Sequence, residues 1–574
     1  MACDGSACRW LLNKTNPEYV GYIARLAAVS PTCAQVLINR GLKTSERIDA
    51  FLNPRLDKLS DPFALPGMQK AVERIRAAKR QGERVLIHGD YDADGVTATA
   101  IMVEALRSLG IDVHYFVPHR LDHGYGFGAP GVARAREVGA RLIVTVDCGI
   151  TSFDAVASAR ALGIEVVVTD HHEPLRPGED NGGGALLPEA AAVINPKLPG
   201  APAEAVSLAG AGVAFMVARA LFDGNMDDVH RFLDLAALGT SADVVPVVDD
   251  NRVILKEGIT LIRRGERTGI RALRDAAGIR PDSFRMSSLH FALIPRLNAA
   301  GRIADATDVV RLLTTEDEAE AEELAEWLNG CNLRRQEIEE GVYQEALGSL
   351  NTMDSIPDAL VLASPGWHLG VVGIVAAKLA ERFFRPAFVL TVEDGVAKGS
   401  GRSIPAFDMH HGLSRCSELL TRFGGHKQAA GLALASGHIE RFRTMMGELV
   451  RAELSPDDFL PLLRLDAAVN LSDLSTSLVD ELSRLEPFGN GNDEPVLGAR
   501  GLEVVQPKVV GNNHLKMKLR QNGRRVDSIG FDFGGLLGEL EERSVIDAAF
   551  SPAINEWDGS RFLQLHLKAI RLSE

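Results

Sequence analysis

The strongest constraint on the fold is an alternation of apolar runs with amphipathic stretches between residues 84 and 170. The apolar runs are RVLIHGD (84–90), DVHYFVP (112–118), RLIVTVDCG (141–149) and IEVVVTD (164–170). Nearly continuous Val, Ile and Leu is typical of parallel strands covered on both faces, and the stretches between them have helical periodicity. The pattern therefore predicts a doubly wound α/β domain with a parallel sheet.

The rest of the chain changes pattern several times, as its length of 574 residues leads one to expect. A charged helical stretch is followed by a second α/β pattern and then by short alternating runs, which are typical of a small antiparallel barrel. We predict an N-terminal segment (1–50), a large α/β domain (51–314), a connecting helix (315–350), a second α/β domain (351–458) and a β-barrel (459–574).

The charge balance bears on nucleic-acid binding. The formal charge of −15 argues against a protein that coats nucleic acid nonspecifically, but it allows local basic surfaces. Residues 503–528 hold six Lys or Arg against Glu503 and Asp527, which leaves a local charge of +4. A basic barrel is a candidate single-strand binder, and a solvated edge strand explains the same composition equally well.

Targeting and redox signals are weak. No apolar run approaches the roughly 18 residues that span a bilayer, and the first residues, MACDGSACRW, do not resemble a signal peptide. The six cysteines are too scattered for a disulfide framework. These features lead us to expect a cytoplasmic protein without membrane contact.

Three carboxylates and an imidazole follow the first predicted strand. If the chain stays extended, His88, Asp90, Asp92 and Asp94 point to one side, where they would repel one another unless they hold cations. A calcium loop of the EF-hand type is excluded because its twelfth position would be Ile101. The Gly-x-Gly-x-x-Gly match at 126–131 contains a proline and lacks a clean strand-to-helix placement, which argues against a dinucleotide site.

Further polar groups recur where later strands are expected to end. They are Asp147, the run Asp170-His171-His172, and Asp243. Carboxylate and imidazole ligands suit manganese, and a pair of such ions is a common device for phosphoester cleavage. Four carboxylates would neutralise two divalent ions, so the site would still accept an anionic phosphate.

The same segments resemble the successive motifs of the DHH phosphoesterase superfamily. GSGRS (399–403) and GGH (424–426) are similar to the phosphate-binding parts of its DHH-associated domain. PRLNAAGR (295–302) and GWHLGVVGIVAAKLAER (366–382) narrow the resemblance to the RecJ family of single-stranded-DNA-specific 5′ to 3′ exonucleases. The resemblance implies release of 5′-mononucleotides with two Mn²⁺ or Mg²⁺ ions, a C-terminal OB-fold, and a role in DNA repair and recombination.

The resemblance also implies a role for each matching residue. His88 and Asp92 would bind one metal ion, Asp94, His171 and Asp243 would bind the other, and Asp147 would bridge them. His172 would lie beside the scissile phosphate, with Asp170 orienting its neighbours. The predicted phosphate-neutralising residues are Arg296, Asn298 and Arg302.

DNA contacts are implied in the same way. The expected pocket for the 5′-phosphate contains Arg120, Ser400, Arg402 and His426. Tyr125 is a candidate for base stacking, and the candidate groove residues on the barrel are Lys516, Lys518 and Arg520.

The resemblance suggests single-stranded DNA as the substrate, with single-strand-binding protein and a RecQ-type helicase as candidate partners. We expect a monomer associated with the bacterial nucleoid. An alternative is a DHH phosphodiesterase that acts on short oligonucleotides or cyclic dinucleotides, which would not need the barrel. A DNA-binding scaffold with an inactive site is a third hypothesis, and the intact set of ligand positions argues against it.

Overall fold

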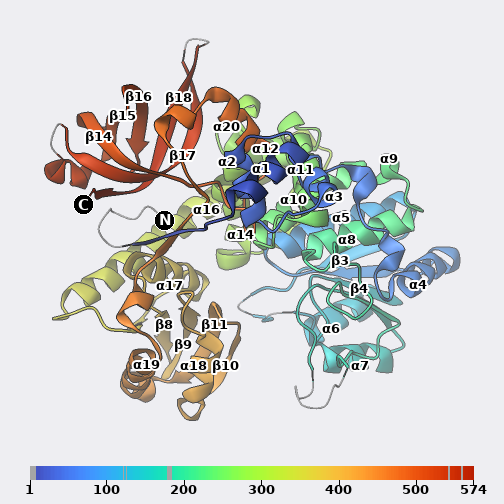
Figure 1. Cartoon of the computed structure of the whole chain (residues 1–574). Coiled ribbons are helices and arrows are strands. Elements are labelled where there is room, and N and C mark those ends of the chain that lie inside the picture. Colours follow the sequence, from blue (N-terminus) through green and yellow to red (C-terminus); the bar gives the residue numbers. More distant parts are fainter. Residues whose placement is uncertain are drawn as a thin grey trace. The chain divides into compact units, whose positions relative to one another are not determined.

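The computed structural model describes residues 8–120, 122–124, 126–176, 184–540, 543–557 and 560–573. The chain divides into two compact units (Figure 1). Unit 1 comprises Met1–Lys43, Arg334–Arg484 and Glu494–Glu574, and unit 2 comprises Thr44–Leu333 and Leu485–Asp493.

Unit 2 is built on a five-stranded parallel sheet with the order β3-β2-β4-β5-β6. The strands are β2 (Val85–His88), β3 (Val113–Phe116), β4 (Leu142–Val146), β5 (Glu165–Thr169) and β6 (Ala192–Ile194). The first four lie inside the four predicted runs. The chain leaves β2 to build one edge and then returns to build the other, so the crevice between β2 and β4 is the point where ligands bind in sheets of this kind.

Both faces of this sheet are covered. Val85 and Ile87 belong to one apolar core, whereas Leu86 between them belongs to a second core on the opposite face. The helices of unit 2 are α3 (Ser45–Leu52), α4 (Met68–Gln81), α5 (Ala93–Ser108), α6 (Ala129–Glu137), α7 (Phe153–Ala161), α8 (Gly210–Leu221), α9 (Met226–Val229), α10 (Leu233–Ala242), α11 (Asp249–Arg264), α12 (Thr268–Ala276), α13 (Met286–Ser288), α14 (Ile294–Ile303) and α15 (Thr307–Thr314). The predicted doubly wound domain is confirmed.

The second α/β region lies in unit 1. The long helix α16 (Glu318–Asn351) contains the division between the units and leads into a sheet with the order β10-β11-β9-β8-β7. Its strands are β7 (Leu360–Pro365), β8 (Ala387–Glu393), β9 (Val396–Arg402), β10 (Leu420–Gly425) and β11 (Ala429–Ala435). Its helices are α17 (Leu369–Phe383), α18 (Met409–Arg415) and α19 (Ile439–Glu453).

The barrel of unit 1 closes because β14 pairs with both β15 and β17. Its strands are β13 (Ala467–Ala468), β14 (Leu497–Val510), β15 (His514–Gln521), β16 (Arg524–Gly530), β17 (Val545–Trp557) and β18 (Ser560–Leu572). The remaining elements of the unit are β1 (Arg9–Leu12), α1 (Pro17–Ala27), α2 (Pro31–Asn39), β12 (Leu462–Leu465) and α20 (Thr476–Ser483). The predicted barrel is therefore confirmed.

Residues 485–493 pack with unit 2 although the sequence pattern grouped them with the barrel. The buried guanidinium of Arg252 donates hydrogen bonds to the carbonyls of Glu486 at 2.8 Å and Pro487 at 3.4 Å.

In the described part of the chain no single helix has the length and apolarity to cross a bilayer, and α1 and α2 meet that criterion only as a pair bent by 100°.

Candidate metal centre and nucleic-acid interface

The loop after β2 turns into helix α5, so the chain does not stay extended from His88 to Asp94, which was the condition for their side chains to point to one side. The strand ends at His88, and Asp92 caps α5 by accepting hydrogen bonds from the N–H groups of Asp94 and Gly95, both at 3.0 Å. Asp is a favoured N-cap residue because its carboxylate satisfies these otherwise unpaired donors. The helix start, rather than strand alternation, brings the carboxylates together.

Asp94 is held by a second helix. Its two carboxylate oxygens accept the N–H groups of Gly210 at 2.7 Å and Ala211 at 2.8 Å, at the start of α8. The partial positive charge of a helix N-terminus stabilises such a carboxylate. A Cβ atom at Gly210 would lie 2.5 Å from an oxygen of Asp147, so only glycine allows this close approach.

Asp147 and Asp243 complete the acidic group from two other elements. Asp147 follows β4 in the left-handed region with φ 59°, and its side chain is buried. Asp243 was expected at a strand end, but it caps the C-terminus of helix α10. Helix α10 can approach Asp94 closely because Gly239 has no side chain. A Cβ atom at this position would lie only 2.5 Å from an oxygen of Asp94.

His171 lies close to three of these carboxylates. Its Nε2 atom lies 3.1 Å from Asp147 Oδ1, 3.8 Å from Asp94 Oδ2 and 3.7 Å from Asp243 Oδ2. Three groups have ligand atoms within 4.8 Å of one another: Asp94, His171 and Asp243; Asp90, Asp92 and Asp147; and Asp147, His171 and His172. Asp147 is shared between two of them, as a bridging ligand would be.

The chemistry of this set fits divalent cations. Asp147 Oδ1 and His171 Nε2 are buried and make no hydrogen bond within the described chain. Burial, together with the neighbouring carboxylates, raises the pKa of Asp94 to about 7 and that of Asp243 to about 6. Burial likewise raises the pKa of Asp147. Carboxylates that repel one another in a buried site need either protons or cations.

Asp90 lies in one of the three groups, whereas His88, a predicted ligand, lies in none of them. The His88 imidazole belongs to none of the three groups and contacts the rings of Phe116 and Phe127, with centroid distances of 5.4 and 5.0 Å. Burial lowers the pKa of His88 to about 4. Asp90 instead joins Asp92 and Asp147. The Asp-x-Asp-x-Asp spacing was the available signal for Asp90, and the predicted ligand set omitted it.

Asp170 organises the loop that carries both histidines. One of its oxygens accepts the N–H of His171 and contacts His172 Nδ1, both at 2.7 Å, and the other accepts the N–H of Ile150 at 2.9 Å. Burial alone would lower the pKa of His172, but the hydrogen bond and the charge of Asp170 raise it to about 9. His172 therefore carries a positive charge beside the carboxylates at neutral pH.

The helix α14 packs on the metal-binding loop. Asn298 Oδ1 accepts the N–H of Ala93 at 2.8 Å, and a Cβ atom at Gly301 would lie 2.3 Å from the carbonyl of Tyr91. Arg296 donates to Asn329 Oδ1 at 3.0 Å and to the carbonyl of Ala292 at 2.9 Å. Arg302 is half-buried at the end of the helix. Asn298 thus supports the loop, and its contact with the phosphate stays a prediction.

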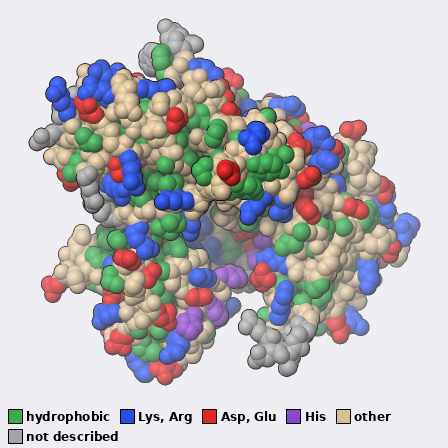
Figure 2. Space-filling view, viewed as in Figure 1, with side chains coloured by type: hydrophobic (Ala, Val, Ile, Leu, Met, Phe, Trp, Pro, Cys, Tyr) green, Lys and Arg blue, Asp and Glu red, His purple; other side chains and the backbone are tan. Residues whose placement is uncertain are grey.

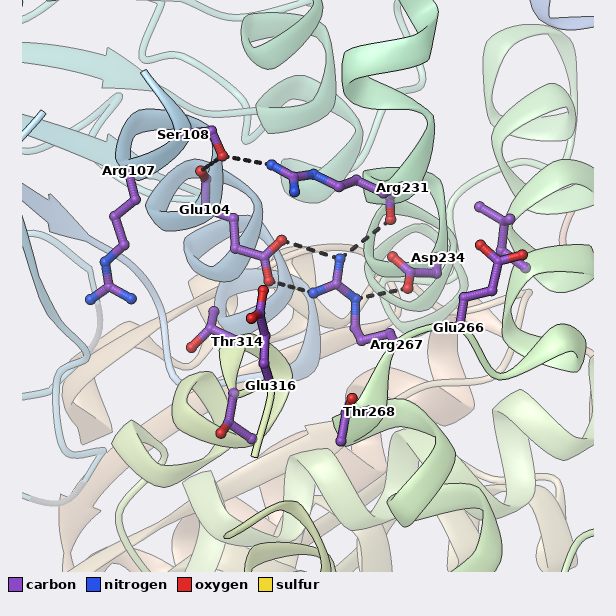
Figure 3. A pocket seen from close by; sticks show the side chains of 12 residues that line it. Glu104, Arg107, Ser108, Arg231, Asp234, Glu266, Arg267, Thr268, Thr314 and Glu316 are labelled. Carbon is purple, nitrogen blue, oxygen red and sulfur yellow. Dashed lines mark hydrogen bonds and ion pairs between the residues drawn. The ribbon is translucent and has the colours of Figure 1, made fainter. Parts of the chain in front are cut away.

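A second polar network anchors the far end of α5. The largely buried Arg267 donates to Asp234 at 2.7 Å and to both oxygens of Glu104 (Figure 3). It also donates to the carbonyl of Leu313 at 2.8 Å. Glu104, Asp234 and Arg267 line a pocket of about 340 Å³, and none of the predicted site residues lines it. The network holds α5 against its neighbours, and this helix presents Asp94 to the metal centre.

The residues predicted to bind the 5′-phosphate belong to both units of the chain. Ser400 and Arg402 project from the same face of β9, where Arg402 donates to Ser400 Oγ at 2.7 Å. A Cβ atom at Gly373 of α17 would lie 3.3 Å from both side chains. His426 is exposed after β10. In unit 2, the Arg120 guanidinium lies 5.3 Å from the Tyr91 ring centroid, and Tyr125 lies outside the described residues.

The barrel presents cations and aromatic rings on one face. Lys516, Lys518 and Arg520 alternate along β15, so they share a side of the sheet. Arg520 is paired with Glu503, and Lys518 lies 4.0 Å from Asp527. Figure 2 shows several Lys and Arg side chains over the barrel strands.

The sequence patterns did not predict the cluster of aromatic rings on this face of the barrel. Phe531 is 47% exposed and contacts the rings of His514 and His566, with centroid distances of 5.3 and 5.6 Å. The pairing of β15 with β16 and of β16 with β18 brings these three residues together. No spacing within a single strand would reveal such a cluster.

Comparisons with known proteins match all three folded regions. The family models that match are the DHH family N-terminal domain at residues 84–240, the DHHA1 domain at 357–452 and the RecJ OB domain at 465–569. The single-stranded-DNA-specific exonuclease RecJ of Bacillus subtilis is 37% identical over 573 residues, covering 99% of this chain and 71% of that protein. RecJ of Escherichia coli is 37% identical over 565 residues, covering 94% of this chain and 95% of that protein.

Solved structures agree over nearly the whole chain. RecJ from Thermus thermophilus in complex with Mn²⁺ superposes with a TM-score of 0.83 and 31% identity, covering 99% of this chain and 80% of that one. The complex of that protein with Mg²⁺ gives a TM-score of 0.77 and 30% identity, covering 99% of this chain and 79% of the other.

Proposed function

The chain belongs to the RecJ family of single-stranded-DNA-specific exonucleases, and from this premise we propose that it removes 5′-mononucleotides from the 5′ end of a single strand by metal-dependent hydrolysis. The observation that carries the proposal is the set of three ligand groups that meet through Asp147 and His171 at the carboxyl ends of β2, β4 and β5. The cofactors are divalent metal ions, Mn²⁺ or Mg²⁺. DNA repair and recombination are processes that use such an activity.

The metal ligands divide between two ions. Asp94, His171 and Asp243 would hold one ion, and Asp92 would hold the other, with Asp147 between them. The position of Asp90 supports it as a further ligand of the second ion, and His88 stays a predicted ligand. Two bound divalent ions supply a water molecule of lowered pKa and neutralise charge on the phosphate. His172, held as a cation by Asp170, would add positive charge beside the scissile phosphate.

The pH dependence of metal binding follows from the raised pKa values. Protonated carboxylates do not bind cations, so Mn²⁺ affinity should rise by about tenfold or more between pH 5.5 and pH 8, as Asp94 and Asp243 lose their protons. Calorimetric titration of the metal-free protein with Mn²⁺ measures this change. A dissociation constant that is the same across this range would contradict the assignment.

The stability of the metal-free protein should have the opposite pH dependence. Asp94 and Asp243 have raised pKa values in the folded state, so above about pH 4 the folded chain retains protons that the unfolded chain releases. These two groups therefore lower the stability progressively as the pH rises from about 4 to about 7. Bound Mn²⁺ should raise the melting temperature more at pH 8 than at pH 5.5.

We attribute the 5′ to 3′ direction of digestion to binding of the terminal 5′-phosphate. Ser400 and Arg402 lie against Gly373 in the N-terminal half of α17, where the helix dipole and a guanidinium favour a dianionic group. We infer that they bind the 5′-phosphate, with His426 and Arg120 as further contacts. Lys516, Lys518 and Arg520, together with Phe531, support a binding surface for the strand on the barrel.

Replacing Arg402 with Gln tests the 5′-phosphate pocket. A hydrogen bond to a charged group contributes about 1.5–3 kcal/mol, so KM for a 5′-phosphorylated strand should rise by roughly 10- to 100-fold. KM for a 5′-hydroxyl strand should change little. Arg422→Gln, an exposed arginine on β10 of the same sheet, is the matched control. Equal losses on both strands would remove Arg402 from the pocket.

The direct test of the function is Mn²⁺-dependent digestion of a 5′-phosphorylated single strand. A strand accessible only at its 3′ end, a blunt duplex and a dinucleotide are assayed in parallel. Release of mononucleotides from the free 5′ end alone supports the proposal. Hydrolysis confined to the dinucleotide would instead assign the chain to the short-substrate phosphodiesterases, although the match to the RecJ OB domain at 465–569 favours a longer strand.

We further propose that the protein acts as a monomer in the bacterial cytoplasm, at the nucleoid. A nuclease specific for single strands needs a source of them, which supports a RecQ-type helicase and single-strand-binding protein as partners. Analytical ultracentrifugation tests the oligomeric state. Binding of each purified partner by interferometry, at near-physiological salt, tests the interactions.

A further inference from the structure

We propose that Phe291 is a stacking platform for a base of the substrate strand next to the metal centre. The inference rests on the proposed single-strand exonuclease function and adds a subsite to it. Phe291 is 81% exposed, the largest exposed fraction among the large apolar side chains of the described chain. Phe531 and Phe562 on the barrel reach only 47% and 54%.

The backbone around Phe291 is unusual. It lies in the π-helical turn η6 (Leu289–Leu293), which leads directly into α14. Turns of this kind insert one residue into a helix and occur frequently at functional sites. Leu289 and Leu293 are fully buried on either side, so the turn is anchored while the Phe291 ring projects into solvent. The ring contributes little to the core, which points to a ligand as the reason for its position.

A continuous stripe connects Phe291 to the metal-binding loop. Pro295, Asn298 and Arg302 follow Phe291 at helical spacing and are partly exposed, whereas Leu293, Leu297 and Gly301 are buried. Asn298 contacts the N–H of Ala93 at 2.8 Å, next to the ligand Asp92. Asn298 lies seven positions after Phe291, which is about 10 Å along the helix axis.

The charge of the segment that carries the stripe favours a nucleic-acid strand as the occupant. Residues 283–304 contain no Asp or Glu and three arginines, in a chain with a net charge of −15. Arg285 is exposed, and Arg296 and Arg302 are half-buried. Cations that attract phosphates beside a ring that stacks on bases are the usual elements of single-strand binding. A helix of a protein partner would need several apolar side chains along the stripe. Asn298 and Arg302, which follow Phe291 there, are polar, so the stripe does not fit such a helix.

The geometry also predicts which base is bound. At the stacked spacing of about 3.4 Å per nucleotide, the rise of about 10 Å from Phe291 to Asn298, which contacts the metal-binding loop, corresponds to roughly three nucleotides. The ring should therefore contact one base about three positions from the nucleotide at the metal centre.

Fluorescence of 2-aminopurine tests this contact directly. The probe base is placed in turn at each of the first six positions of a 5′-phosphorylated strand, and the strand is bound to the full-length protein without Mn²⁺. Quenching should reach a maximum near the third or fourth position in the wild type and in Phe291→Trp, and should be lost in Phe291→Ala. The matched control is Phe63→Ala, since Phe63 is 38% exposed in the turn Pro62–Ala64. Equal quenching in the wild type and Phe291→Ala would overturn the proposal.

Kinetics distinguish this subsite from the catalytic function. Phe291→Ala should raise KM for the single strand roughly tenfold and change kcat less than about twofold, because stacking is lost while the metal centre is intact. Hydrolysis of the p-nitrophenyl ester of thymidine 5′-monophosphate, which lacks the distant base, should be unchanged. If the wild type degrades the strand and Phe291→Ala matches its KM, the subsite is refuted alone. If the wild type does not degrade the strand at all, the proposed function fails as well.

Discussion

Asp147→Asn should lower kcat for single-strand hydrolysis more than about 100-fold while leaving strand binding largely intact. Replacing a group that only orients a metal ligand lowers metal affinity or activity by about 10- to 100-fold, so replacing a bridging ligand should lower activity more. Asp147 is shared by two of the three ligand groups, and its buried Oδ1 makes no hydrogen bond in the described chain. DNA affinity depends mainly on cations that contact phosphates, and this substitution removes none of them.

Asparagine is the appropriate replacement because Asp147 has φ 59°, a conformation that Asn tolerates and Ala does not. Mononucleotide release in Mn²⁺ gives kcat, and fluorescence anisotropy without metal gives the affinity for the strand. Asp223→Asn is the matched control, since Asp223 is an exposed aspartate with φ 53° outside the site. Turnover by Asp147→Asn within tenfold of the wild type would refute the bridging role.

Arg267→Met should lower the free energy of unfolding by about 3–5 kcal/mol, because it leaves one buried and one largely buried carboxylate without their cation. The guanidinium is paired with Glu104 and Asp234, and their side chains are 18% and 7% exposed (Figure 3). Burial alone would lower the pKa of Arg267, but these two charges raise it further above its usual value, so its charge is permanent. Since Glu104 lies on α5, the same substitution should also weaken Mn²⁺ binding at the other end of that helix.

Urea denaturation monitored by circular dichroism gives the stability, and calorimetry gives the Mn²⁺ affinity. Arg231→Met is the matched control, because Arg231 lines the same pocket but is exposed, and it should change the stability by less than about 0.5 kcal/mol. The combined variant Glu104→Gln, Asp234→Asn and Arg267→Met should recover part of the loss. A combined variant no more stable than Arg267→Met would show that lost packing, and not the unpaired charges, causes the effect.

Much of the fold and the outline of the metal centre follow from local sequence patterns. The apolar runs that became β2, β3, β4 and β5 identify a parallel sheet, and the carboxyl ends of parallel strands lie at one edge. Asp147 and His171 follow two of these strands, so their proximity was predictable. The resemblance of the motifs to a known family added the division of ligands between two ions, which spacing alone did not provide.

Only the tertiary structure decided the details of the site. The hydrogen bonds that hold Asp94 come from Gly210 and Ala211, 116 and 117 residues further along the chain, and the contact between Ala93 and Asn298 spans 205 residues. The packing of these elements also places Asp90 beside Asp92 and Asp147, and exposes Phe291 at the start of a helix stripe. Local sequence determines where helices and strands begin, because caps and periodicity act over a few residues. Which side chains meet depends on how these elements pack, and packing is set by the whole domain.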